Sequence, residues 1–365
     1  MKWLQGFGAA VGVFTVLAFT GQPARSEEIP KEYRDCIRKG LKYLVDTQNR
    51  DGHWEAFGSQ YPITMTAVSG MAFLMEGSTI KEGKYSKQIR LATDWLMSRA
   101  VPSGQIGNPM IPGEAGRYMY GHGFAILFLS SVYGEEEESD RRRKLEEILT
   151  KAVLFTGKAQ TKRGGWGYVS AADGGDFDEG SVTVTQMQAV RAARNAGISV
   201  PKEIIEKGVK YLKDSTVGGG VIYSLAGGGG GAGSHALTAA AIACGFSAGE
   251  YDNPTVKEWI KFCQGHLGGA TGGINRIGHD EYTHYYFSQS VYFLGEDGYK
   301  KLFPSSRESE RLIWSKYRKD SYSNIKSAQN ADGSWTGSQV GPAFATPIYL
   351  CILQLDNNVL PIYQR

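Results

Sequence analysis

The chain has 365 residues, of which 41% are hydrophobic and 21% charged, and its formal net charge is +3. This length and hydrophobic share are ample for a sizeable core. The 48 glycines follow no short G-X-Y period, which excludes collagen-like and disordered classes. The near-neutral charge, without a basic stripe, excludes a nucleic-acid-binding protein.

The first 26 residues have the features of a targeting segment. Lys2 supplies a positive charge, residues 7–19 form an apolar run too short for a stable membrane span, and Ala24-Arg25-Ser26 suits a cleavage site. We therefore predict a signal peptide over residues 1–26 and export of residues 27–365 to the periplasm or the medium; the alternative is that residues 1–26 stay attached as an uncleaved anchor. No later apolar run approaches membrane-spanning length, so we expect membrane contact to be peripheral at most.

The four cysteines are scattered along the chain, at Cys36, Cys244, Cys263 and Cys351. They form no C-x-x-C pair of the kind that binds zinc. In an oxidising compartment one or two disulfides can form. Cys244 and Cys351 lie within apolar runs, which favours small buried hydrophobic residues.

Three segments share one pattern of glutamine, glycine and tryptophan. Residues 48–54, 160–166 and 329–335 each read Q-x-x-x-G-x-W, and degenerate copies occur near 218–223 and 264–273. Each complete copy ends a stretch with apolar residues at helical spacing and precedes a more apolar stretch. The glycine suits a turn with unusual backbone angles, the tryptophan can cover that turn, and the glutamine amide can bond backbone groups left unpaired at a helix end. The pattern predicts a repeated helical hairpin.

The repeat predicts six hairpins. Their first helices are amphipathic and charged, as in an outer ring, and span residues 31–48, 84–99, 140–160, 201–213, 254–265 and 306–329. Their second helices are apolar on more sides, as in a fully buried inner ring, and span residues 62–76, 119–133, 181–196, 234–246, 282–294 and 343–354. Two concentric rings make an all-α, α6/α6 toroid, which we predict as a single domain.

The three copies resemble the QW repeats of squalene/hopene cyclases, and the predicted toroid is similar to the β-subunits of protein prenyltransferases. The segments Met-Tyr-Gly-His-Gly-Phe at 119–124 and Leu-Pro-Ile-Tyr-Gln-Arg at 360–365 resemble a group of exported bacterial repeat proteins. The resemblance covers nearly all of the predicted mature chain. It implies a toroid that handles an isoprenoid, although a fold alone does not fix a reaction.

The run Asp176-Phe177-Asp178-Glu179 resembles the D-x-D-D motif of class II terpenoid cyclases, with Glu179 in place of the last aspartate. Clustered carboxylates cannot all ionise cheaply, so one keeps its proton at a raised pKa. The resemblance implies that Asp178 is the acid that protonates an isoprenoid double bond, with Asp176 and Glu179 orienting it. Aromatic faces would surround the carbocation, and no cofactor is needed.

The same run has a structural interpretation. Acidic residues just ahead of a helix cap its N-terminus, and the Asp-Gly-rich stretch at 172–175 is typical of an exposed loop. The direction of the side chains distinguishes the two interpretations. Catalytic carboxylates would face a closed apolar cavity, whereas residues that only cap would face solvent.

A second set of candidates lies near the starts of the predicted inner helices: Tyr120, His122, Tyr282, His284 and Tyr285. If these helix starts share one rim, the five side chains form a polar, aromatic mouth to the cavity. The alternative is that the histidines are structural.

No metal site is predicted. A zinc prenyltransferase needs a D-x-C pair and a histidine on inner helices. The segment around His284 resembles the histidine part, displaced by one position, but no D-x-C pair accompanies it. A thioester-bearing toroid would need a G-C-G-E-Q segment, and the sequence contains none.

Two functions from different classes follow. One is a class II cyclase-like enzyme that protonates or binds an isoprenoid lipid in an aromatic cavity. The other is a non-catalytic toroid that binds a lipid, a glycan or a protein partner. Export favours a lipid available at the membrane surface over a soluble diphosphate made inside the cell.

Overall fold

The computed structural model describes most of the chain, namely residues 29–107, 113–114, 116–227, 231–267, 280–337 and 340–364. The predicted signal peptide lies outside the described residues, and so does part of the degenerate copy near 264–273. No helix in the described part of the chain is long and apolar enough to cross a membrane.

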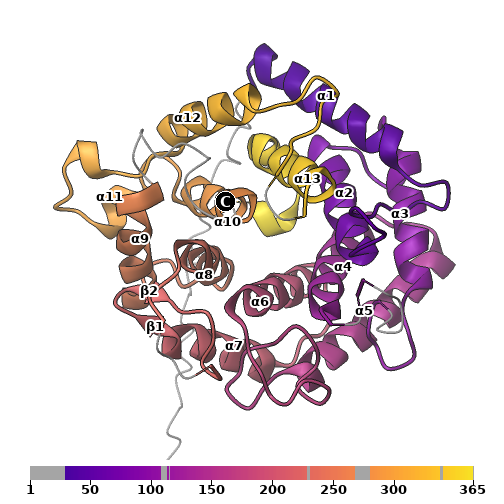
Figure 1. The fold of residues 1–365 in the computed structure, drawn as a ribbon, viewed down its shortest axis with the longest axis horizontal. Coiled ribbons are helices and arrows are strands. Elements are labelled where there is room, and N and C mark those ends of the chain that lie inside the picture. Colours follow the sequence, from indigo (N-terminus) through magenta and orange to yellow (C-terminus); the bar gives the residue numbers. More distant parts are fainter. Residues whose placement is uncertain are drawn as a thin grey trace, which may run out of the picture.

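Two concentric rings of helices form the fold (Figure 1). The outer helices are α1 (Lys31–Thr47), α3 (Ser86–Ser98), α5 (Ser139–Ala159), α7 (Lys202–Asp214), α9 (Pro254–Leu267) and α12 (Trp314–Ser327). The inner helices are α2 (Pro62–Glu76), α4 (Tyr118–Tyr133), α6 (Gly180–Asn195), α8 (His235–Ser247), α10 (Asp280–Leu294) and α13 (Pro342–Leu353). Each inner helix packs on the next, and α13 packs on α2 to close the ring. The predicted α6/α6 toroid is confirmed.

Burial separates the two rings as predicted. In the inner helix α2 every residue except Glu76 is buried. In the outer helix α7 only Ile204, Gly208, Tyr211 and Leu212 are buried. An outer helix therefore needs one apolar stripe, whereas an inner helix is enclosed on all sides. All four cysteines are free thiols buried in this core.

Some elements differ from the prediction. The outer helix expected over residues 306–329 begins only at Trp314. Before it, the backbone N–H and the guanidinium of Arg307 donate to the Glu310 carboxylate around a separate short turn, η1 (Glu308–Glu310), and the extended backbone at Arg311 and Ile313 separates this turn from the helix. The short helix α11 (Gly298–Leu302) and the hairpin β1 (Thr216–Val217) and β2 (Gly220–Val221) were not predicted. Two short turns, η2 (Leu355–Asn357) and η3 (Pro361–Tyr363), follow α13.

The glutamine of each QW turn (residues 48–54, 160–166 and 329–335) joins neighbouring hairpins. The Gln160 amide donates to the carbonyl of Gly164 at 2.7 Å and to that of Ile204, on the next outer helix, at 3.1 Å. Gln48 makes the same pair of bonds to Gly52 and Gln88. Gln329 does so to Gly333 and Cys36, which joins the last outer helix to the first.

The tryptophan of each turn joins the two helices of its own hairpin. The Trp166 indole donates to the carbonyl of Thr156, in α5, at 2.8 Å, and its backbone N–H donates to Thr183 Oγ1, in α6, at 3.0 Å. The equivalent bonds recur at Trp54 and at Trp335. The carbonyls that accept from the indoles lie in the last turns of α1, α5 and α12, so tryptophan, and not glutamine as predicted, bonds the helix ends.

The contact of the turn glycine with the next outer helix leads to a prediction that tests how neighbouring hairpins pack. Gly164 has φ +94°, and a Cβ there would lie 2.4 Å from the carbonyl oxygen of Lys207. Gly197 has a similar φ of +88° with nothing within 4 Å. We expect Gly164→Ala to lower the free energy of unfolding by about 3–5 kcal/mol and Gly197→Ala by about 1–2 kcal/mol. Urea denaturation measures both, and equal losses would contradict a tight contact between neighbouring hairpins.

Candidate functional site

A cavity of about 550 Å³ opens where the inner helices begin. Residues from the first turns of all six inner helices line it, together with the loops that precede α2, α4, α6, α8 and α13. Its aromatic lining residues are Tyr61, Tyr120, Phe124, Tyr168, Tyr223, Tyr282 and Phe344. The arrangement agrees with the expected cavity that the inner ring surrounds.

Most phenol groups of this cavity are already hydrogen-bonded within the protein. Tyr120 bonds to the Ser181 hydroxyl, and the Tyr168 and Tyr223 hydroxyls bond to each other. The Tyr282 hydroxyl donates to the Ser181 carbonyl at 3.4 Å. Burial raises the pKa of Tyr120 and Tyr282 well above the ordinary value, so both stay neutral. A ligand would therefore meet mainly ring faces.

Glu179 is the carboxyl group of the D-x-D-E run that lines the cavity. It is the N-cap of α6, where its Oε2 accepts hydrogen bonds from the Val182 N–H at 2.9 Å and the Ser181 hydroxyl at 2.6 Å. The Tyr120 hydroxyl donates to the same oxygen at 3.3 Å. Burial raises the pKa of Glu179 despite these bonds. Capping and a cavity-facing position therefore occur in the same residue.

Asp178 lies behind the cavity wall, and its predicted raised pKa is wrong. The carboxylate is fully buried, yet Arg163 Nε donates to its Oδ2 at 2.7 Å. Its Oδ1 accepts from Tyr211, Ser224 and the backbone N–H groups of Leu225 and Ala226. Burial opposes the charge, but the Arg163 guanidinium and these donors outweigh it and lower the pKa of Asp178. An ionised carboxylate cannot serve as the acid.

Asp176 also lies outside the cavity lining. It adopts a left-handed backbone conformation with φ +63°, and its Oδ1 accepts from the Lys162 N–H at 2.8 Å. It lies 3.7 Å from Arg163, to which Asp178 is also paired. Asp176 and Asp178 therefore share one arginine on the outer side of the α6 N-terminus.

His122 is structural. Its Nδ1 accepts a hydrogen bond of 3.1 Å from the Ile106 N–H, and its Nε2 lies 3.0 Å from Thr156 Oγ1. Burial lowers the pKa of His122 to about 3, so the ring stays neutral. The Ile106 N–H donates to His122 as the Trp166 N–H donates to Thr183 in the QW turn. His122 therefore takes the place of the threonine, in a turn that has neither the glutamine nor the tryptophan of the motif. Because these two residues are absent, the Q-x-x-x-G-x-W pattern did not identify this turn.

The remaining rim candidates divide into two groups. Among the described residues, Tyr120 and Tyr282 line the cavity, whereas His284 and Tyr285 are buried and are not part of its lining. His284 Nδ1 lies 3.2 Å from the Tyr317 hydroxyl, and burial lowers the pKa of His284 to about 4. Tyr285 bonds to the Tyr363 hydroxyl. Only part of the expected aromatic mouth is therefore assembled from these residues.

Sequence reasoning missed several lining residues, chief among them Glu281. Its side chain is 3% exposed and lines the same cavity as Glu179. Arg117 stands over the Tyr168 ring at 4.7 Å on the rim. Glu281 is the second residue of α10, as Ser181 is of α6, and this shared position is the signal that could have identified it. In the described part of the chain, no three histidine, cysteine, aspartate or glutamate side chains form a group that could hold a metal ion.

No protein-family model and no curated protein matches the chain. Solved structures share the fold. An inactive variant of the alpha-1,6-mannanase GH76A of Salegentibacter sp. HEL1_6, in complex with alpha-1,6-mannotriose, aligns with 8% identity and a TM-score of 0.61, over 90% of this chain and 99% of that one. The type II terpene cyclase MstE from Scytonema aligns with 12% identity and a TM-score of 0.57, over 91% and 100%.

A variant of that cyclase in complex with geranylgeranyl dihydroxybenzoate also aligns, with 14% identity and a TM-score of 0.54, over 90% of this chain and 98% of that one. These identities establish the fold alone. The chain is an α/α toroid of the kind found in both a glycan hydrolase and a terpene cyclase.

Asp178 makes a prediction about stability. In Asp178→Asn an amide N–H group would face donors, so we expect a loss of about 3 kcal/mol in the free energy of unfolding at neutral pH. A lowered folded pKa stabilises the fold above the unfolded pKa, and this contribution is lost as the pH falls through the folded pKa. The deficit of the variant should therefore shrink in acid. Urea titrations at several pH values measure it, with the exposed Asp46→Asn as a control that should change little.

Glu179 should show the opposite pH dependence. Its raised folded pKa means that the wild type loses stability as the pH rises from the unfolded pKa through the folded pKa. Glu179→Gln lacks this loss, so the variant should gain on the wild type by about 1.4 kcal/mol for each pKa unit between the two states. The same urea titrations test it, and a variant that loses stability relative to the wild type as the pH rises would contradict a raised folded pKa for Glu179.

Proposed function

We propose that this protein is an exported toroid that binds an isoprenoid lipid in its central cavity, and that Glu179 is the acid that protonates the ligand. The observation that carries the proposal is the position of Glu179. It is a buried carboxyl with a raised pKa that lines an aromatic cavity of about 550 Å³.

The chemistry of the lining favours a hydrocarbon ligand. Because the hydroxyls of Tyr120, Tyr168 and Tyr223 are engaged with protein groups, few of them are left to bind the many hydroxyls of a sugar. The ring faces and the side chains of Met65 and Leu237 offer apolar surface instead. A branched, unsaturated chain fits this lining, with a polar end near the rim.

The proposed acid step uses the oxygen of Glu179 that is not needed for capping. The bonds from Val182, Ser181 and Tyr120 all end on Oε2, so Oε1 carries the proton. Transfer of that proton to one carbon of a double bond leaves the positive charge on the more substituted carbon. The faces of Tyr120, Tyr282 and Phe124 would stabilise this carbocation, while the N-terminus of α6 stabilises the carboxylate formed. The next double bond of the chain attacks this cation and closes a ring, and the final carbocation gives a proton to the Glu179 carboxylate, which restores the acid.

The proposal therefore assigns the role of the acid to Glu179 and not to Asp178. Arg163 holds Asp178 in the ionised state, and Asp176 is paired on the outer side. In the proposal Asp178 fixes the loop after β2, since Ser224, Leu225 and Ala226 all donate to it. Glu179 takes over the acid function that the resemblance to cyclases implied for Asp178.

Export places the proposed ligand at the membrane surface. With residues 1–26 as a signal peptide, the mature domain would meet polyprenyl lipids or hopanoids there and would contact the membrane only peripherally. The same fold accommodates an isoprenoid in the MstE complex and a glycan in the mannanase complex. A glycan is the second candidate, because Glu179 and Glu281 give the cavity two carboxyl groups.

Mass spectrometry of ligands extracted from the natively purified mature protein tests the proposal. We expect a cyclised terpenoid on the wild type and its linear precursor on Glu179→Gln. The matched control is Glu281→Gln, which alters the other cavity carboxyl and should keep the cyclised product. The same linear lipid on all three proteins would indicate a carrier without acid chemistry, and a glycan or no ligand on the wild type would refute isoprenoid binding.

A further inference from the structure

The segment after α13 folds back over the inner ring. The side chains of Gln354 and Asn357 donate hydrogen bonds of 3.0 and 2.9 Å to the carbonyls of Ala72 and Met75 in α2. Both acceptors lie at the end of α2 opposite to the cavity-lining Thr64 and Met65. The segment is thus attached to the far end of the toroid.

A buried aspartate fixes the segment to the outer ring as well. Asp356 is 2% exposed and accepts hydrogen bonds from Trp314 Nε1 at 2.7 Å and Arg318 at 2.9 Å, both in α12. Asn358 then adopts a left-handed conformation with φ +53°, and its side chain accepts a bond of 3.1 Å from Tyr292 in α10. This anchored reversal directs the following residues towards the axis of the ring.

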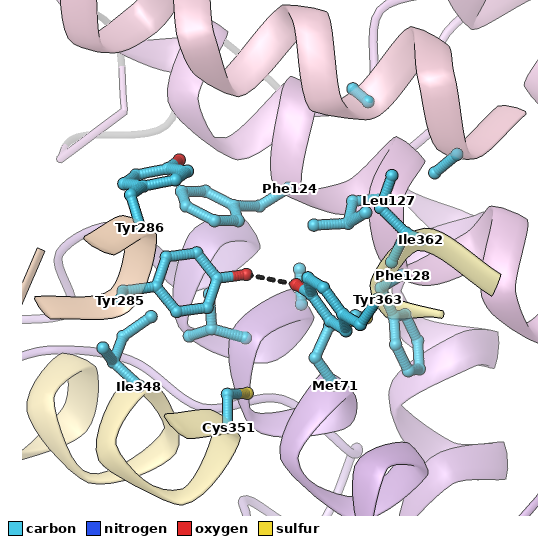
Figure 2. Packing of buried hydrophobic residues seen from close by; sticks show 14 of the residues in the cluster. Met71, Phe124, Leu127, Phe128, Tyr285, Tyr286, Ile348, Cys351, Ile362 and Tyr363 are labelled. Atoms are coloured by element: carbon cyan, nitrogen blue, oxygen red, sulfur yellow. Dashed lines mark hydrogen bonds between the residues drawn. The ribbon is translucent and has the colours of Figure 1, made fainter. Parts of the chain in front are cut away.

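Residues 360–363, which we call the plug, fill the centre of the inner ring. Leu360, Ile362 and Tyr363 are all buried, and η3 packs against α6. Figure 1 shows this yellow end of the chain at the centre of the ring, and Figure 2 shows Ile362 and Tyr363 among side chains of α2, α4, α10 and α13. The Tyr363 hydroxyl bonds to that of Tyr285.

A short series of aromatic contacts connects the plug with the cavity. Tyr282 lines the cavity, and its ring centroid lies 4.8 Å from that of Tyr286. Tyr286 lies 4.9 Å from Tyr285, which bonds to Tyr363. In Figure 2 the cavity-lining Phe124 lies beside Tyr286, above the Tyr285–Tyr363 pair. The plug is therefore the layer beneath the floor of the cavity.

We propose that the plug closes the toroid at its far end and limits how deeply a chain-like ligand can enter the cavity. The length limit is set by Tyr363 acting through Tyr285 and Tyr286, since the ring of Tyr363 blocks their displacement. Tyr363 is in this sense a positioning residue that determines specificity. The inference rests on the proposed isoprenoid ligand.

Binding of prenyl alcohols of increasing length tests the inference. Geraniol, farnesol, geranylgeraniol and longer polyprenols are titrated into the wild type and Tyr363→Ala by isothermal calorimetry. For the wild type we expect affinity to rise with length up to a limit and then to fall. In Tyr363→Ala the longest alcohol bound should increase by at least one isoprene unit, because removal of the phenol leaves room of about that size.

Matched variants separate the length limit from general loosening of the core. Tyr363→Phe keeps the ring, and Phe246→Ala removes a ring that is 1% exposed elsewhere in the inner ring and stacks on Tyr251, so neither should shift the limit. If Tyr363→Ala fails to fold in a thermal melt, Tyr363→Leu serves in its place. Binding with an unchanged limit would overturn the plug inference alone. Absence of binding to the wild type would overturn the proposed function as well.

Discussion

The hydrogen bonds of the QW turns are the constraint on which the toroid depends. An α-helix ends with carbonyl groups that have no partner within the helix. The indoles of Trp54, Trp166 and Trp335 take up one such carbonyl each, and the glutamine amides reach carbonyls of the next outer helix. Each turn therefore fixes both the geometry of its hairpin and the distance to the next. Because the bonds of Gln329 return to α1, the same local rule also closes the ring.

This constraint determines where a site can form. The three QW turns lead into the starts of α2, α6 and α13, and residues from the first turns of all six inner helices line the cavity at one end of the ring. N-terminal N–H groups require acceptors, and buried acceptors at this end become part of the cavity wall. Glu179 is the clearest case, since the carboxyl that caps α6 also lines the cavity. The sequence presented helix capping and a cavity-facing position as two competing interpretations of this run. In the folded protein Glu179 meets both.

The sequence predicted the helices well because their signals are local. Apolar spacing and the Q-x-x-x-G-x-W pattern located all six hairpins to within a few residues, apart from the start of α12. The site was harder to predict because it depends on distant partners. Asp178 and Glu179 are neighbours, and only the contacts of Asp178 with Arg163, Tyr211 and Ser224 determine which of the two faces the cavity. Likewise, the role of His122 follows from Ile106, in a turn without the motif letters.

The opposite pKa shifts of these neighbours follow from one local arrangement. A strand-like residue ahead of a helix points its side chain away from that of the next residue, so the two carboxyl groups lie in different surroundings. Asp178 faces the outer ring, where a guanidinium and backbone donors stabilise its charge, and Glu179 faces the cavity, where burial disfavours charge. Different surroundings can push the pKa values of two neighbouring carboxyl groups apart, so that one serves as an acid and the other stays ionised. Arg163 contributes most to this division, because its guanidinium does most to lower the pKa of Asp178, and the hydrogen bonds from Ala226, Tyr211 and Leu225 act in the same direction.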